Sequence, residues 1–191
     1  RASDEYKEID YDIFKHLPRL AAECIKAKFP MSLEFGRGAA GHSVYKIKNP
    51  SFSTKRIYLG DKCLLEYRTT GSYSIFAGEL DLKEKAKPNQ VTQAVEIEDS
   101  ELIKIFYEAA ALAQLYLIAP KGDGWNNLIL SYGGECKEQG LEEEFTQRIF
   151  EDCLELHNRH DRKKETNKSI AGIYKKDGNS NIFSKNFPIP I

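Results

Sequence analysis

The chain has 191 residues, with 28 basic and 29 acidic side chains and a formal net charge of −1. This length suits one large domain or two small ones, and 41% hydrophobic with 30% charged residues is the mixture of a globular protein, which excludes an intrinsically disordered chain. The balanced charge excludes a uniformly basic surface, so any nucleic-acid-binding surface has to come from local basic clusters.

The cysteines and the hydropathy of the sequence indicate the cellular compartment in which we expect the protein. None of the four scattered cysteines forms a C-x-x-C pair, which argues against a zinc site and favours a reducing, cytoplasmic location. The most apolar stretch, residues 102–119, is interrupted by charged residues, so we expect a buried helix there and no membrane partner. The chain begins at Arg1 and shows no signal peptide, and we expect an N-terminally incomplete fragment.

The first predicted element is a helix over residues 13–28, where apolar residues recur at helical spacing and Pro18 falls near the first turn. The period then changes to that of strands. We expect a strand at residues 32–35, a glycine-rich turn at 36–41, and a second strand at 42–47.

Further strands and then helices follow in the second half. Short β-type patterns predict strands at residues 56–59, 63–67, 73–77 and 91–97. Helical patterns predict helices at residues 101–118, 125–136, 141–157 and 166–175. A linker at 120–124 divides a core, residues 1–120, from a helical domain, residues 123–191. The predicted fold is α+β, a mixed or antiparallel sheet flanked by helices and followed by a small helical bundle.

The glycine-rich turn is the first candidate site. Its glycines let backbone amides approach a ligand closely. Arg37, inside the turn, presents a planar fork that fits phosphate. His42, which opens the next strand, can bond a phosphate or a metal. The alternative is an ordinary hairpin with a surface arginine and a half-buried histidine.

Acidic residues in strand-like segments form the second candidate site. Glu66 stands between apolar neighbours, where its charge requires a partner, either an arginine such as Arg68 or a divalent ion. Asp10 and Asp12 would point to the same face if they lie on a strand, and could then hold Mg²⁺ or Mn²⁺. The alternative is that both are loop acids, with Asp12 capping the helix that follows.

Taken in order, these motifs resemble the catalytic core of the archaeo-eukaryotic primase superfamily, in its bifunctional primase-polymerase branch of plasmids, phages and mobile elements. The resemblance covers residues 33–176. Its motifs are Asp-x-Asp at Asp10 and Asp12, Phe35-Gly36-Arg37 with Gly41-His42-Ser43-Val44-Tyr45, Leu65-Glu66-Tyr67-Arg68-Thr69-Thr70-Gly71, and a following helical domain at 125–176. Two departures are Gly41, where serine is common, and the segment after the third motif, which lacks the family's Pro-Pro-Ser-x-His histidine.

The resemblance implies a DNA primase or polymerase, a DNA-templated nucleotidyltransferase that uses nucleoside triphosphates and Mg²⁺ or Mn²⁺, together with a helicase domain or partner. It implies catalytic metal ligands at Asp10, Asp12 and Glu66, and nucleotide-binding residues at Arg37, His42 and Arg68. The first motif could instead lie before Arg1. The departures also keep open a non-catalytic replication-accessory module that binds nucleic acid. A small metal-dependent nuclease is a third reading, which strand scission would identify.

Overall fold

The chain forms two compact units, Arg1–Ala113 and Gln114–Ile191. A computed structural model describes residues 5–37, 40–50, 53–69, 78–79, 85–88 and 93–176. The division between the units falls inside helix α2 (Asp99–Ile118). The predicted linker, residues 120–124, lies in the connection between α2 and α3 (Trp125–Glu138).

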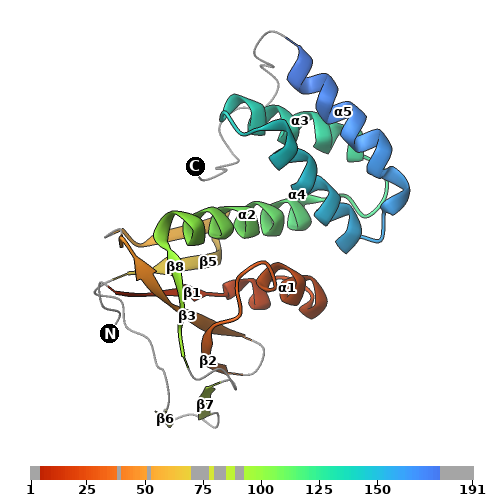
Figure 1. The fold of residues 1–191 in the computed structure, drawn as a ribbon. Coiled ribbons are helices and arrows are strands. Elements are labelled where there is room, and N and C mark those ends of the chain that lie inside the picture. Colours follow the sequence, from red (N-terminus) through yellow and green to blue (C-terminus); the bar gives the residue numbers. More distant parts are fainter. Residues whose placement is uncertain are drawn as a thin grey trace. The chain divides into compact units, whose positions relative to one another are not determined.

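The first unit is built around a mixed sheet of eight strands (Figure 1). The strand order is β4-β5-β1-β3-β2-β7-β6, with β8 alongside β3. The strands are β1 Tyr6–Asp10, β2 Leu33–Arg37, β3 Ala40–Lys48, β4 Lys55–Leu59, β5 Lys62–Arg68, β6 Gly78–Glu79, β7 Lys85–Pro88 and β8 Val95–Glu98. The described pairs are antiparallel apart from β3 with β8, which is parallel. The predicted α+β class with a mixed sheet is therefore confirmed.

The prediction of one helix over residues 13–28 is wrong. A short 3₁₀ helix, η1 (Asp12–Lys15), comes first, and helix α1 runs only from Arg19 to Lys26. Pro18 is the residue before α1. Proline lacks a backbone N–H and fixes its own φ, so it is compatible with the start of a helix and not with its interior.

Aromatic contacts place α1 and the first part of α2 on the same face of the sheet (Figure 1). On β5, the Tyr67 ring packs edge-on against Phe106 of α2, with centroids 5.9 Å apart. Just after β1, the Tyr11 ring packs edge-on against Phe29, which follows α1, at 5.4 Å. The predicted buried helix is confirmed in α2, where Leu102 is fully buried. In the described part of the chain, no helix has the length and apolar character needed to cross a membrane.

The second unit is helical, as predicted. It contains α3, α4 (Glu143–Leu156), a 3₁₀ turn η2 (His160–Arg162) and α5 (Lys163–Lys175). In its core the rings of Tyr132 and Phe150 meet edge-on at 5.9 Å. A Cβ added at Gly133 would lie 3.0 Å from Ile173 Cδ1, so this glycine allows α3 and α5 to pack closely.

Some predicted elements lie outside the described residues. These are the strand at residues 73–77 and the tail from residue 177. The strand predicted at residues 91–97 is observed as β8, Val95–Glu98.

Candidate functional site

The register of three neighbouring strands brings four of the six predicted site residues together. Asp10 on β1 is directly opposite His42 on β3 and, across its other edge, directly opposite Glu66 on β5. Directly opposed residues have their side chains on the same face of a sheet. Arg68, two residues beyond Glu66, shares that face because side chains alternate along a strand.

This face is the one turned away from α1 and α2. Ile9 and Tyr67 are partners in the β1–β5 ladder, and Tyr67 contacts Phe106 of α2. Asp10 comes one position after Ile9, and Glu66 comes one position before Tyr67. Side chains alternate along a strand, so both acids point to the other side of the sheet. Helix α1 and the first part of α2 therefore cover one face of the sheet, and Asp10, His42, Glu66 and Arg68 lie on the opposite one.

Two arginines hold the Glu66 carboxylate. Arg68 Nε lies 3.1 Å from Glu66 Oε2, and Arg68 Nη2 lies 2.5 Å from Asp10 Oδ2. Arg56, opposite Glu66 on β4, places both Nε and Nη2 at 2.7 Å from Glu66 Oε1. The Glu66 side chain is only 8% exposed, whereas that of Arg56 is 54% exposed. Glu66 thus has two arginine partners where one was expected. Arg68 is partly buried and Arg56 is at the surface.

Burial and neighbouring charges act against each other at Asp10. Burial raises the pKa of the Asp10 carboxyl above its usual value; the Arg68 guanidinium lowers it, and Asp12 and Glu66 raise it again. Burial alone would lower the pKa of Arg68, but Asp10 and Glu66 raise it, and the net shift is upward. The loss of hydration at Asp10 therefore outweighs its pairing with Arg68.

Asp12 does not lie on the same strand as Asp10. Strand β1 ends at Asp10, and Asp12 begins η1, where it pairs with Lys15. The expectation that the two acids share a face by strand alternation is therefore wrong. The alternative, that Asp10 is a loop acid, is also wrong because β1 lies between β3 and β5. Asp12 is nevertheless near enough to raise the pKa of Asp10.

Cys63 joins this cluster through a β-bulge. Ile57 pairs with Leu65 and Tyr58 with Cys63, so Leu64 is an extra residue on β5. A bulge of this kind re-aims the side chains that follow it. Burial raises the pKa of the Cys63 thiol to about 11, and Asp12, Glu66 and Asp10 reinforce the shift. The thiol thus stays protonated at neutral pH.

The glycine-rich turn is a β-hairpin, with Gly36 paired to Gly41 and Arg37 to Ala40. The His42 ring is half-buried and lies 6.2 Å from the Phe35 ring, centroid to centroid. The side chain of Arg37 is outside the described part of the structure. Only the backbone of Arg37 is described, and it lies two residue pairs along the hairpin from the Phe35–His42 pair, which is level with Asp10.

Three residues of this face were not predicted as site residues. Glu8 is 1% exposed, lies opposite Arg68, and helps to raise the pKa of that arginine. Arg56 and Cys63 are the other two. The position of Glu8, two residues before Asp10, would have indicated it once residues 6–10 were interpreted as a strand. Nothing local in the sequence indicates which strand Arg56 faces.

The chemistry of the carboxylates fits a hard divalent ion, because Mg²⁺ and Mn²⁺ prefer oxygen ligands. Asp10 and Glu66 face each other across one strand pair, with Asp12 within electrostatic reach. Among the described residues, however, no group of three or more histidine, cysteine or acidic side chains is arranged to hold an ion. Arg68 contacts both Asp10 and Glu66, so a shared ion would have to replace it.

No protein-family model matches the chain, and neither does any curated protein or solved structure. The primase-polymerase resemblance therefore depends on the order of the motifs.

Proposed function

We propose that the sheet face carrying Asp10, His42 and Glu66 is the nucleotidyl-transfer site of a DNA-templated primase or polymerase. The observation that carries the proposal is the register. Three motifs that are far apart in the sequence supply directly opposed residues on three adjacent strands. Acidic residues on two strands beside a histidine on a third suit metal-assisted chemistry on a nucleoside triphosphate.

In this proposal the 3′-hydroxyl of a primer attacks the α-phosphorus of a nucleoside triphosphate, and the bond to the pyrophosphate leaving group breaks. Asp10 and Glu66, with Asp12 nearby, would hold Mg²⁺ or Mn²⁺, which would supply Lewis-acid activation of the hydroxyl and charge neutralisation. His42 and Arg37 hold the triphosphate. Arg68, displaced from the two carboxylates by the ion, would bind a phosphate through its planar guanidinium.

The position of Asp10 suits a metal ligand, because it lies in the ladder between His42 and Glu66. The proton of the attacking hydroxyl passes to water. Glu66, held by Arg56 and Arg68, is fixed in position before any ligand arrives.

Primer extension on a DNA template with Mg²⁺ or Mn²⁺ tests the proposal. Glu66→Ala and His42→Ala should each abolish incorporation while leaving the far-UV circular dichroism unchanged. Glu96→Ala is the matched control, because Glu96 pairs with Lys46 and Lys48 at the surface. Wild-type rates in both site variants would overturn the assignment of the site.

A second function is favoured by a specific observation. Arg56 and Arg68 already neutralise Glu66, and Arg68 also reaches Asp10, so the acids form a paired network without any ion. A replication-accessory module that binds nucleic acid needs no metal ion, so its carboxylates would stay paired with Arg56 and Arg68. Template binding without incorporation, also in a chain extended at its N-terminus, would favour this second function over the first.

A further inference from the structure

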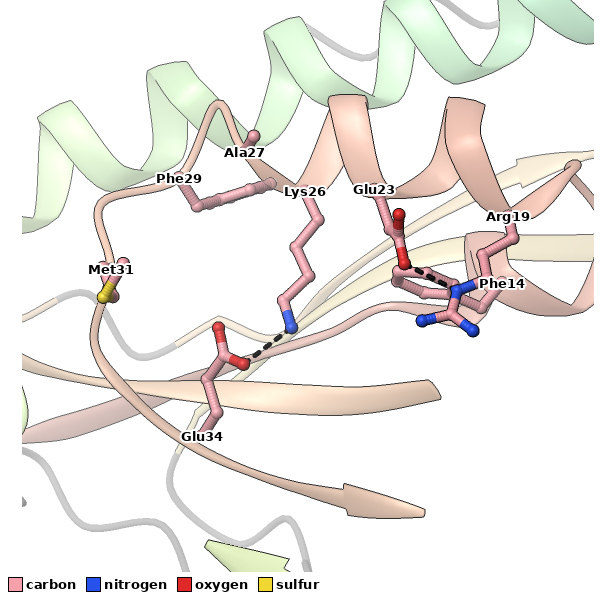
Figure 2. Close-up of a pocket in the computed structure, with 8 residues that line it drawn as sticks. All are labelled: Phe14, Arg19, Glu23, Lys26, Ala27, Phe29, Met31 and Glu34. Carbon is pink, nitrogen blue, oxygen red and sulfur yellow. Dashed lines mark hydrogen bonds and ion pairs between the residues drawn. The ribbon is translucent and has the colours of Figure 1, made fainter. Parts of the chain in front are cut away.

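A pocket lies on the opposite side of the sheet from Asp10 and Glu66, between α1 and β2 (Figure 2). Its volume is about 530 Å³, which lies in the range of small-molecule sites. Phe14, Phe29 and Met31 supply its apolar surface, and charged side chains from α1 and β2 point into it. Phe29 is held from behind by its edge-on contact with the Tyr11 ring.

An ion pair spans the pocket. Lys26 Nζ lies 2.7 Å from Glu34 Oε2, and the two side chains are 24% and 27% exposed (Figure 2). The other oxygen of Glu34 accepts a hydrogen bond from Ser43 Oγ at 3.3 Å. Ser43 in turn accepts one from the buried Tyr11 hydroxyl at 3.0 Å. The pair is therefore positioned by groups in the core of the protein.

Tyr11 also steadies the cation of this pair. Lys26 Nζ lies 5.2 Å from the centroid of the Tyr11 ring, within the range of a cation–π contact. One buried tyrosine thus contacts Phe29 and Lys26 directly and Glu34 through Ser43. A set of side chains fixed in this way is pre-organised, which lowers the cost of binding a ligand.

The pair offers a donor and an acceptor side by side. An ammonium group has three N–H donors, of which the bond to Glu34 uses one, and a carboxylate carries lone pairs on both oxygens. A ligand can therefore bond to Lys26 and Glu34 together without breaking the bond between them. Its edge must carry an acceptor next to a donor.

The charges of the pocket favour a neutral ligand. Arg19 and Glu23 at the rim form a second ion pair, at 2.7 Å, so the two cations and two anions of the lining balance. A polyanion would gain little in a site of zero net charge. Aromatic walls favour a flat ring, which can stack on them or meet them edge-on.

We propose that this pocket binds a nucleobase, a neutral planar ring whose edge carries an adjacent hydrogen-bond acceptor and donor. The base is either that of a free nucleoside or one presented by a single strand. The proposal does not depend on the function assigned to Asp10 and Glu66, because it uses none of their atoms.

The test titrates the full chain with adenosine, with purine riboside, which lacks the amino donor, and with a single-stranded oligoadenylate, using calorimetry and ligand-observed NMR. Lys26→Met should weaken the binding about tenfold, as expected for one charge-assisted hydrogen bond. Purine riboside should bind more weakly than adenosine by a similar factor. Lys104→Met, an exposed lysine on α2, is the control and should bind like the wild type.

A charge-swapped variant separates binding from folding. Lys26→Glu combined with Glu34→Lys keeps an ion pair but removes the cation over the Tyr11 ring and the acceptor for Ser43, so it should fold and bind adenosine more weakly. Binding of the oligonucleotide alone, lost in Lys26→Met, would support a base presented by a strand. The proposal is overturned if no probe binds the wild type, or if the swapped variant and Lys26→Met bind as the wild type does.

Discussion

Replacing Arg68 with methionine tests the charge network of the candidate site. The substitution removes a guanidinium that contacts both Asp10 and Glu66 and is only 20% exposed. Breaking a buried ion pair by removing one partner costs about 3–5 kcal/mol, and the remaining exposure places Arg68→Met near the lower limit. For a unit the size of Arg1–Ala113, a loss of about 3 kcal/mol corresponds to a fall in Tm of roughly 10–20 °C.

Thermal unfolding followed by circular dichroism measures this loss, with Arg56→Met as the control. Arg56 also pairs with Glu66, but its side chain is 54% exposed, so its removal should cost under about 1 kcal/mol. Millimolar Mn²⁺ should restore part of the Tm of Arg68→Met, because the freed carboxylates then bind the ion. Equal losses in the two variants, with no effect of Mn²⁺, would refute this account of the network.

Three further predictions concern titratable groups. Burial raises the pKa of Asp10 above its usual 3.8, so ionised Asp10 costs stability, and Asp10→Asn should gain stability relative to the wild type as the pH rises above 3.8. Burial lowers the pKa of His157 below its usual 6.5. Neutral His157 therefore contributes fully to the stability of the fold above pH 6.5, and this contribution is lost as the pH falls through the lowered pKa; His157→Phe should remove this pH dependence. The Cys63 thiol, with a pKa of about 11, should be alkylated far more slowly at neutral pH than the exposed Cys24.

Each of these predictions has a direct check. Urea unfolding measures the difference in the free energy of unfolding between Asp10→Asn and the wild type. This difference should not be the same at about pH 3 and at about pH 7, and equal differences would contradict the raised pKa of Asp10. Unfolding curves for His157→Phe that follow the wild type at every pH would contradict the role of His157, whose ring stacks on that of Tyr116 at 4.4 Å. Mass spectrometry after a short alkylation should find Cys24 modified first, and equal labelling of Cys63 would contradict the raised pKa of its thiol.

Strand periodicity predicted much of the first unit. The β2–β3 hairpin and strands β4 and β5 were predicted close to their observed bounds because their alternating apolar residues and glycines are local signals. The helix at residues 13–28 was predicted too long, since tertiary structure allows η1 before Pro18 where the apolar pattern alone indicates a continuous helix.

The position of β1 could not be predicted from local pattern. Its sequence, Tyr6–Asp10, is largely polar, yet Lys7 is fully buried and Glu8 nearly so, because the strand lies between β3 and β5. Which strands flank it depends on contacts far apart in the sequence, and the same is true of the bulge that re-aims Cys63. The sequence therefore predicted which residue types form the candidate site. That they lie together around Asp10 could be known only from the register of β1 with β3 and β5.

Template-directed incorporation is the measurement that tests the central claim most directly. The full chain, supplied with a primer on a homopolymer DNA template, Mn²⁺ and one α-labelled nucleotide at a time, should incorporate only the complementary nucleotide, and Glu66→Ala should incorporate none. A folded chain that binds the template and incorporates no nucleotide would contradict the claim that Asp10, His42 and Glu66 form a nucleotidyl-transfer site.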